Sequence, residues 1–266
     1  MKIAALQLST LPLSNSKLNE YLKNCQAKGI RIVVLGEYVL NNFFKDIEKM
    51  PKILIKEQSA YKIEALESYA ILYNLTIVAP LVIVENNKVY KTVAKFSPTG
   101  TTYRKQAFLI NDRRWNEEAF FDNEMNSDIE PMIFEANGLT FGVINGFEIH
   151  FDALWLRLMN AGVNVVLLPT VSTFGSNLRW NEILKTRAFL NGLYILRVNR
   201  IGSYHDKNTF LEFYGETYLV NPDGNIESSL THQEDMLIAS IDKRELKSAN
   251  QTWQFKDQLK QRGLLV

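Results

Sequence analysis

The chain has 266 residues, of which 46% are hydrophobic and 22% are charged, a balance typical of globular proteins. Its formal net charge of +1 argues against a nucleic-acid-binding protein, and no apolar run approaches the roughly 18 residues that span a bilayer. No low-complexity linker or charge block divides the sequence, so we expect a single domain over residues 1–266. A single cysteine and the lack of an export signal in the first residues predict a cytoplasmic protein without disulfides.

Two hydrophobic periodicities alternate along the first hundred residues. Helical periodicity occurs over residues 16–28, where Leu18, Leu22 and Cys25 share one face, and over residues 59–74. Runs typical of strands occupy residues 3–8, 32–35, 76–84, 88–97 and 101–105. The Glu-Asn-Asn at 85–87 lies between two of these runs and predicts a β-hairpin.

The rest of the chain continues this alternation. Residues 141–151 have the pattern of a buried strand, a tight turn and then a helix. Further helices are predicted over 151–161 and 178–191, strands over 163–168 and 194–199, and a hairpin through 213–220 that turns at 221–224. Mixed β-α units with hairpins between them predict an α/β fold of two sheets packed face to face, with helices outside.

Three residues, each at the end of an apolar segment, suggest a catalytic site. They are Glu37, Lys105 and Gly146. The tight turn at Gly146 is of the kind on which hydrolases present a nucleophile. In this order the three segments resemble the nitrilase (carbon–nitrogen hydrolase) superfamily, whose triad is Glu, Lys and Cys. Glu37 and Lys105 match that triad, whereas Gly146 stands where the family places its cysteine.

The resemblance extends over nearly the whole chain and is strongest to the N-carbamoylputrescine amidase branch. The later motifs that carry it are Asn199-Arg200-Ile201-Gly202, residues 213–217, Pro222-Asp223-Gly224, and Trp180 with Arg187-Ala188 and Asn191. The resemblance implies a four-layer αββα sandwich. Family members commonly dimerise through helices beside the active site and through the C-terminal tail. The resemblance therefore implies a dimer, with residues 248–266 as a candidate dimerisation arm.

The family mechanism assigns a role to each matched position. A cysteine thiolate attacks the C–N carbon, a glutamate moves protons and a lysine stabilises the oxyanion. By position, Glu37 is then the base and Lys105 the oxyanion stabiliser. Glu117 or Glu118 is the second family glutamate, with Glu117 preferred because Trp115-Asn116-Glu117 fits the family's aromatic-polar-Glu pattern. Phe147 and Glu148, next to the vacant position, are candidate substrate-binding residues.

No other residue is an obvious replacement for the thiol. Cys25 lies on an apolar helical face, where a cysteine behaves as a small hydrophobe. Thr170 and Ser172 follow the next strand and are candidates to face the pocket, but no dedicated base accompanies them. The three histidines, His150, His205 and His232, are widely separated and lack paired ligands, so no metal is expected. No phosphate-binding glycine loop occurs, and no cofactor is expected.

Three functions remain open from the sequence. The first is a catalytically impaired homologue that keeps a pocket for a small amide or carbamoyl compound. The second is an active amidohydrolase that uses water or another hydroxyl as its nucleophile. The third is a non-catalytic interaction protein whose fold serves assembly, as a homodimer or a higher homo-oligomer. In each case thioester chemistry at position 146 is excluded, because glycine has no side chain.

Overall fold

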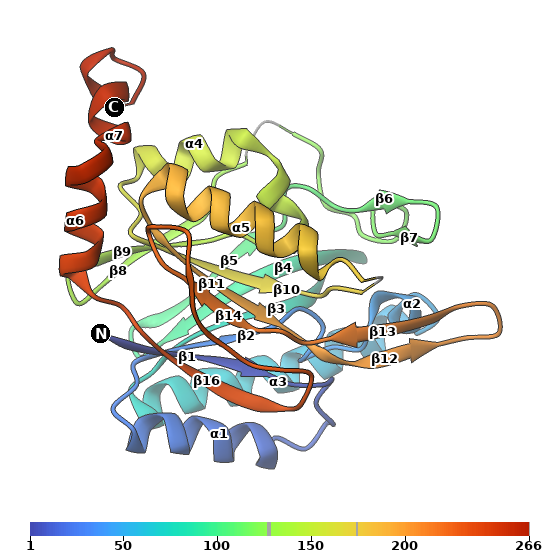
Figure 1. Cartoon of the computed structure of the whole chain (residues 1–266). Helices are drawn as coiled ribbons and strands as arrows, with labels where there is room; N and C mark the ends of the chain where they lie inside the picture. Colours follow the sequence, from blue (N-terminus) through green and yellow to red (C-terminus); the bar gives the residue numbers. More distant parts are fainter. Residues whose placement is uncertain (127–128, 174, 266) are drawn as a thin grey trace.

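The computed structural model describes residues 1–126, 129–173 and 175–265, which form two six-stranded sheets packed face to face (Figure 1). The first sheet contains, in spatial order, β16 (Asp235–Ser240), β1 (Lys2–Gln7), β2 (Ile32–Leu35), β3 (Thr76–Glu85), β4 (Lys88–Ser97) and β5 (Gly100–Lys105). The second contains β15 (Ile226–Ser229), β14 (Tyr218–Val220), β11 (Tyr194–Asn199), β10 (Val165–Thr170), β9 (Leu139–Val143) and β8 (Met132–Ala136). The central strands β1, β2 and β3 pair in parallel, as do β9, β10 and β11.

Helices cover the outer faces of both sheets, so the predicted αββα sandwich is confirmed. Helices α1 (Ser16–Ala27) and α3 (Lys52–Tyr73) lie on the first sheet, and α4 (Asp152–Asn160) and α5 (Asn177–Asn191) lie on the second (Figure 1). Strand alternation explains this layering. Ile3 and Ala5 of β1 pack in the core between the sheets, whereas Ala4 and Leu6 pack in the core beneath the helices.

Several elements differ from the pattern-based expectation. Helix α3 begins at Lys52, directly after Pro51 and seven residues before the predicted start, because proline is well tolerated at a helix N-terminus. Residues 213–220 do not form one strand. Gly215 and Glu216, which have left-handed φ values of 74° and 60°, separate β13 (Phe210–Tyr214) from β14. Strand β13 pairs instead with β12 (Ile201–His205), and the predicted turn at 221–224 joins β14 to β15.

The remaining short elements gather at one end of the sandwich. They are α2 (Phe44–Ile47), β6 (Asn111–Asp112), β7 (Trp115–Asn116) and the 3₁₀ helix η1 (Gly146–His150). Together with the β12–β13 arm, α2 and the β6–β7 hairpin project from the same side of the molecule (Figure 1). These segments supply much of the buried aromatic cluster that contains Phe43, Phe44, Trp115 and Phe213.

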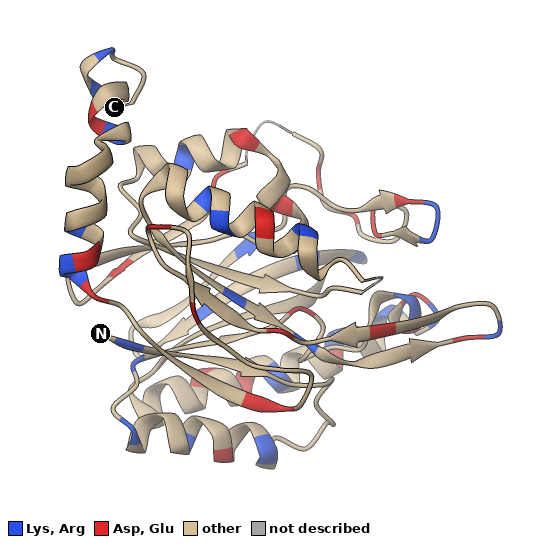
Figure 2. Ribbon diagram, in the orientation of Figure 1, with Lys and Arg blue, Asp and Glu red and all other residues tan. Residues whose placement is uncertain are grey.

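The C-terminal segment forms α6 (Lys243–Trp253) and α7 (Phe255–Gln261), which run along one side of the second sheet and extend beyond it (Figure 1). The rings of Trp253 and Phe255 pack against Phe189 of α5. Val266, the last residue of the predicted arm, lies outside the described residues. Within the described ranges, no helix is both long and apolar enough to cross a bilayer. Figure 2 shows acidic and basic residues interspersed on the ribbon, consistent with the net charge of +1.

Candidate active site

Glu37 lies just beyond the carboxyl end of β2 and is only 2% exposed. Its backbone N–H donates to the Thr170 carbonyl at 3.2 Å, which ties the first sheet to the end of β10 in the second. The preceding Gly36 permits this approach. A Cβ at position 36 would lie 3.1 Å from the Arg200 nitrogen, closer than most real Cβ contacts. The glycine therefore lets the chain carry Glu37 in between the two sheets.

Lys91, in the middle of β4, is the cation that meets Glu37. Its Nζ lies 2.7 Å from Glu37 Oε1 and 2.7 Å from Glu117 Oε1, and the three side chains are 4%, 3% and 0% exposed. The Tyr38 hydroxyl donates to the same Glu117 oxygen at 2.6 Å. We refer to Glu37, Lys91 and Glu117 as the charged cluster. Its members come from three separate segments, and a single ammonium group joins them.

The charged cluster is a coupled electrostatic unit with two carboxylates and one cation. Burial raises the pKa of Glu37 to about 7; the Lys91 ammonium opposes this shift, and the Glu117 carboxylate adds to it. Burial alone would lower the pKa of Lys91, but its two carboxylate neighbours outweigh that effect and raise it. Burial, and then the Glu117 charge, raise the pKa of Tyr38 well above its usual value. Glu37 therefore exchanges its proton near neutral pH.

Gly146 begins η1, directly beside the charged cluster. A Cβ at this position would lie 2.7 Å from Glu37 Oε2, a separation that real Cβ atoms essentially never show. The φ of Gly146 does not fall in the left-handed region, so the backbone does not require glycine there. What glycine provides is space for the Glu37 carboxylate. The position predicted to be a vacant nucleophile site thus lies in contact with Glu37.

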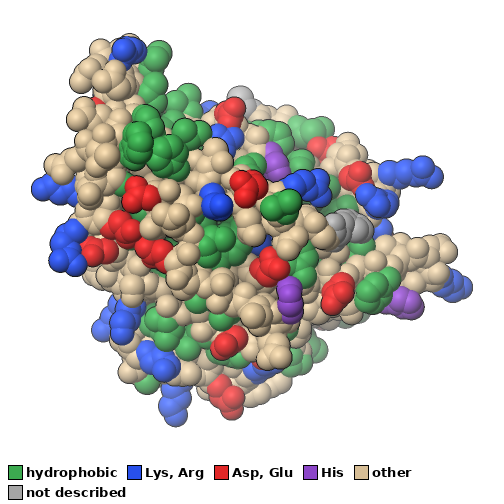
Figure 3. Space-filling view, in the orientation of Figure 1, with side chains coloured by type: hydrophobic (Ala, Val, Ile, Leu, Met, Phe, Trp, Pro, Cys, Tyr) green, Lys and Arg blue, Asp and Glu red, His purple; other side chains and the backbone are tan. Residues whose placement is uncertain are grey.

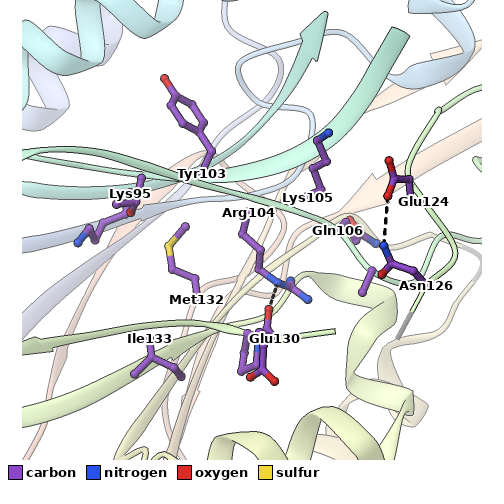
Figure 4. Close-up of a pocket in the computed structure, with 13 residues that line it drawn as sticks. Lys95, Tyr103, Arg104, Lys105, Gln106, Glu124, Asn126, Glu130, Met132 and Ile133 are labelled. Atoms are coloured by element: carbon purple, nitrogen blue, oxygen red, sulfur yellow. Dashed lines mark hydrogen bonds between the residues drawn. The ribbon is translucent and has the colours of Figure 1, made fainter. Parts of the chain in front are cut away.

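Lys105 does not join the charged cluster. Its side chain is 45% exposed, and its Nζ lies 3.5 Å from the centre of the Tyr90 ring and 4.0 Å from Glu85 Oε2. It lines an open groove of about 520 Å³ bordered by β5 and β8 (Figure 4). Strand alternation gives the reason. Arg104 uses its inward position to bind Glu148, so the next side chain points to the other face of β5.

The other predicted site residues are dispersed around the charged cluster. Glu148 is fully buried and binds both Nη atoms of Arg104, at 2.6 and 2.7 Å, as well as the Asn145 N–H at 2.8 Å. These bonds make it a clamp between β5 and η1. Phe147 is half-buried, with its ring beside those of His150 and Phe151.

The three remaining predicted residues bond to separate partners. The Thr170 hydroxyl donates to Asn199 Oδ1 at 2.9 Å, and the Ser172 Oγ accepts from Arg197 at 2.9 Å. Glu118 accepts a hydrogen bond from Asn111 instead of entering the charged cluster. Of the two candidate second glutamates, Glu117 is therefore the one placed beside Glu37.

Aromatic side chains close off the space around the charged cluster. The Tyr38 ring packs edge-on against Phe43 at 5.3 Å, and Phe43 packs against Trp115 at 4.8 Å and Phe213 at 5.3 Å. The cavity that borders Glu37 and Lys91 has a volume of about 10 Å³, which is room for about one water molecule. Among the described residues, no group of three or more His, Cys, Asp or Glu is arranged to hold a metal ion.

Sequence reasoning did not single out Lys91. A usable signal was present, because strand alternation places Lys91 on the same face as Val89 and Val93. A lysine between two valines on an apolar face is expected to be buried with a partner of opposite charge. The Tyr103-Arg104-Lys105 motif drew attention to a different lysine.

Comparison with known proteins extends the similarity to nearly the whole chain. The family model described as carbon-nitrogen hydrolase matches residues 2–251. An N-carbamoylputrescine amidase from Oryza sativa subsp. japonica is 23% identical, over 95% of this chain and 89% of the relative. Among solved structures, a carbon-nitrogen hydrolase from Helicobacter pylori G27 has a TM-score of 0.80 at 17% identity, covering 96% of this chain and 94% of the other.

A second solved structure is an amidase from Nesterenkonia sp. AN1 that carries acrylamide at its active-site cysteine. It has a TM-score of 0.77 at 16% identity, covering 95% of this chain and 99% of that one. At these identities the structural likeness establishes the fold.

We expect Lys91→Met to lower the free energy of unfolding by about 3–5 kcal/mol, because it leaves two buried carboxylates without their shared cation. Lys105→Met is the matched control. Its ammonium is half-exposed, so we expect a change within about 1 kcal/mol. Urea unfolding measures both values, and equal effects of the two substitutions would contradict the assignment of Lys91 as the buried cation.

The raised pKa of Glu37 predicts a pH dependence of stability. The unfolded carboxyl ionises near 4.5, while the folded one holds its proton until about 7. The free energy of unfolding should therefore fall as the pH rises through this window, by on the order of 3 kcal/mol, and then level off. Glu37→Gln should lack this component. Parallel pH profiles of the two proteins by urea unfolding would refute the shift.

Proposed function

Because the chain belongs to the carbon-nitrogen hydrolase family, we propose that it is a member that does not hydrolyse amides through a thioester. The observation that carries this proposal is the contact between position 146 and Glu37. The residue beside the charged cluster has no side chain, and the Glu37 carboxylate lies 2.7 Å from the point at which a Cβ would stand. The one cysteine of the chain, Cys25, is buried on α1, and its Sγ lies 3.3 Å from Met236 Sδ.

The chemistry of amide cleavage explains why this difference matters. Hydrolysis through a covalent intermediate needs a nucleophile, a proton acceptor and an oxyanion stabiliser. Glu37 and Lys91 have the chemical character of the second and third. In a well-studied hydrolase the loss of the nucleophile alone lowers turnover by about a million-fold. Retaining an acid–base pair does not compensate for a loss of that size.

The closed surroundings of the charged cluster also favour a non-catalytic role. A cavity of about 10 Å³ does not hold an amide or carbamoyl compound, so binding one there would require the side chains that line it to move. Tyr38, which is one of them, has a left-handed φ of 56° that is unfavourable for a bulky side chain. The surrounding packing holds this conformation in place, with the Tyr38 hydroxyl bound to Glu117 and its carbonyl accepting from Arg200 at 2.8 Å.

One observation favours a second candidate, a slow hydrolase that uses water. A carboxyl group with a pKa of about 7 suits a general base at neutral pH, and the small cavity beside Glu37 has room for one water. Such an enzyme would depend on Glu37 and would remain far slower than one with a cysteine. The first candidate predicts no amide turnover at all. The second predicts a slow turnover that is lost when the Glu37 carboxylate is replaced.

We expect the purified protein to show no turnover of N-carbamoyl amines or small ω-amides above the rate in buffer, with ammonia release as the measurement. Glu37→Gln is the control for water-based catalysis. Turnover that this substitution abolishes would establish the second candidate and overturn the first.

Gly146→Cys probes the same site directly. Because its Cβ would press on Glu37 Oε2, we expect it to be folded but less stable, by about 1–3 kcal/mol, and without restored activity. Gly146→Ala is the matched control, because it adds the Cβ without the thiol. A cysteine variant with clear amidase activity would show that the pocket had stayed open for substrate.

Assembly as a homodimer is part of the same proposal. Exposed apolar side chains lie on α4, α5 and the C-terminal segment, namely Leu156, Leu190, Trp253 and Leu264, with exposed fractions of 44–60%. Figure 3 shows hydrophobic side chains gathered beside the C-terminal segment. The proposed cytoplasmic location is supported by the one cysteine, which is buried and unpaired.

Removing residues 255–266 should convert the dimer to a monomer, as measured by light scattering after size exclusion. Ile71→Glu is the control, because Ile71 is 66% exposed on α3, on the opposite side of the sandwich, and we expect it to leave the mass unchanged (Figure 1). A truncated protein with unchanged mass would exclude α7 from the interface.

A further inference from the structure

Arg197, in β11, is a buried cation that belongs to no ion pair in the part of the chain that the structure describes. The residue is 0% exposed. Its Nη2 donates to the Ser172 Oγ at 2.9 Å and to the Tyr214 hydroxyl at 3.2 Å, and its Nη1 donates to the Glu216 carbonyl at 3.3 Å. Its Nε has no hydrogen-bond partner. All of these contacts are to neutral groups.

Three aromatic rings surround the guanidinium. Its Cζ lies 4.8 Å from the centre of the Trp180 ring, 5.3 Å from Tyr218 and 5.5 Å from Tyr214. Such contacts stabilise a desolvated cation. Buried charges are otherwise paired with an opposite charge, because removing a cation from water is costly. Within the described residues, no carboxylate pairs with Arg197.

Two adjoining hollows border this aromatic box. One, of about 380 Å³, includes Tyr214 in its lining, and the other, of about 260 Å³, includes Tyr218 and Asn181. Both are also lined by Glu216 and His232. Among the described residues, Asn181 Oδ1 is buried without a hydrogen-bond partner, and the buried Tyr218 hydroxyl makes no hydrogen bond of regular geometry. Burial raises the pKa of Tyr218 to about 12 against the opposing effect of the neighbouring Arg197 guanidinium, so its hydroxyl keeps the proton that it can donate.

The two hollows carry the opposite charge to the box behind them. Glu216 lines both and Glu212 lines the larger, and the described residues of the two linings include no lysine or arginine. Glu216 has a left-handed φ of 60°, a conformation that costs energy for a residue other than glycine. In this conformation its backbone carbonyl accepts a hydrogen bond from Arg197, and its side chain lines the hollows. A simple anion would be repelled by these carboxylates, and a simple cation would leave Arg197 unpaired.

We propose that this region binds a small zwitterionic compound of the amino-acid type. The Tyr218 hydroxyl donates a hydrogen bond to the ligand carboxylate, and Arg197 is the buried counter-charge. The Glu216 carboxylate accepts from the ligand ammonium. Asn181 Oδ1 accepts a second hydrogen bond from the ammonium. None of these residues belongs to the charged cluster around Glu37, so the inference does not depend on whether the protein hydrolyses amides.

Titration calorimetry with glycine, β-alanine, 4-aminobutyrate and 5-aminopentanoate tests the proposal, since the series varies the distance between the two charges. We expect saturable binding of at least one of them, and binding weaker by about tenfold or more for butyrate and butylamine, which carry one charge each. No saturable binding by any of the four compounds up to about 10 mM would overturn the site.

Variants assign the two ends of the site. Arg197→Met and Tyr218→Phe should each weaken binding of the best compound, the first by at least about tenfold. Glu216→Gln should weaken the binding of the amino acid but not that of butyrate. Lys105→Met, which is remote from the box, should bind like the unaltered protein. Unchanged affinity in both Arg197→Met and Tyr218→Phe would contradict the proposal. Should Arg197→Met fail to fold, Tyr218→Phe decides alone, because it removes one hydroxyl and keeps the ring.

Discussion

The ammonium group of Lys91 is the interaction on which the organisation of the candidate active site depends. It reaches two carboxylates from different segments, one at the end of β2 and one after β7, and all three groups are shielded from water. In that setting the ion contacts offset desolvation only while every member is present. The Tyr38 ring, whose hydroxyl binds Glu117, packs against Phe43, and Glu37 in turn lies against Gly146. Local electrostatics, aromatic packing and the lack of a side chain at position 146 are thus parts of one arrangement.

The sandwich could be predicted because its strands follow a simple rule. Residues 32–35 are apolar on both faces, as a strand covered on both sides must be, and they form β2 at the centre of the first sheet. Local breaks were harder to predict. The start of α3 at Lys52 and the interruption at Gly215-Glu216 depend on a proline cap and on two left-handed residues, whose effects hydrophobic periodicity does not contain.

The placement of site residues followed the same division. Glu37 and Glu117 meet at Lys91, and Gly146 lies beside Glu37, because each of the three follows the end of a strand. Lys105 does not, since one step along β5 reverses the direction of a side chain, and Arg104 takes the inward direction to reach Glu148. Lys91 and Arg197 lie within strands. Their partners come from distant parts of the chain, so the sequence pattern does not identify them.

The contact between Glu37 and Gly146 also bears on how this chain could change over evolutionary time. A side chain gained at position 146 would place its Cβ 2.7 Å from Glu37 Oε2, so the carboxylate would have to shift. Lys91 Nζ holds that carboxylate at 2.7 Å, and a shift would therefore also disturb the ion pair. Substitutions at position 146 and in the charged cluster are linked in this way, and we expect the two sites to vary together.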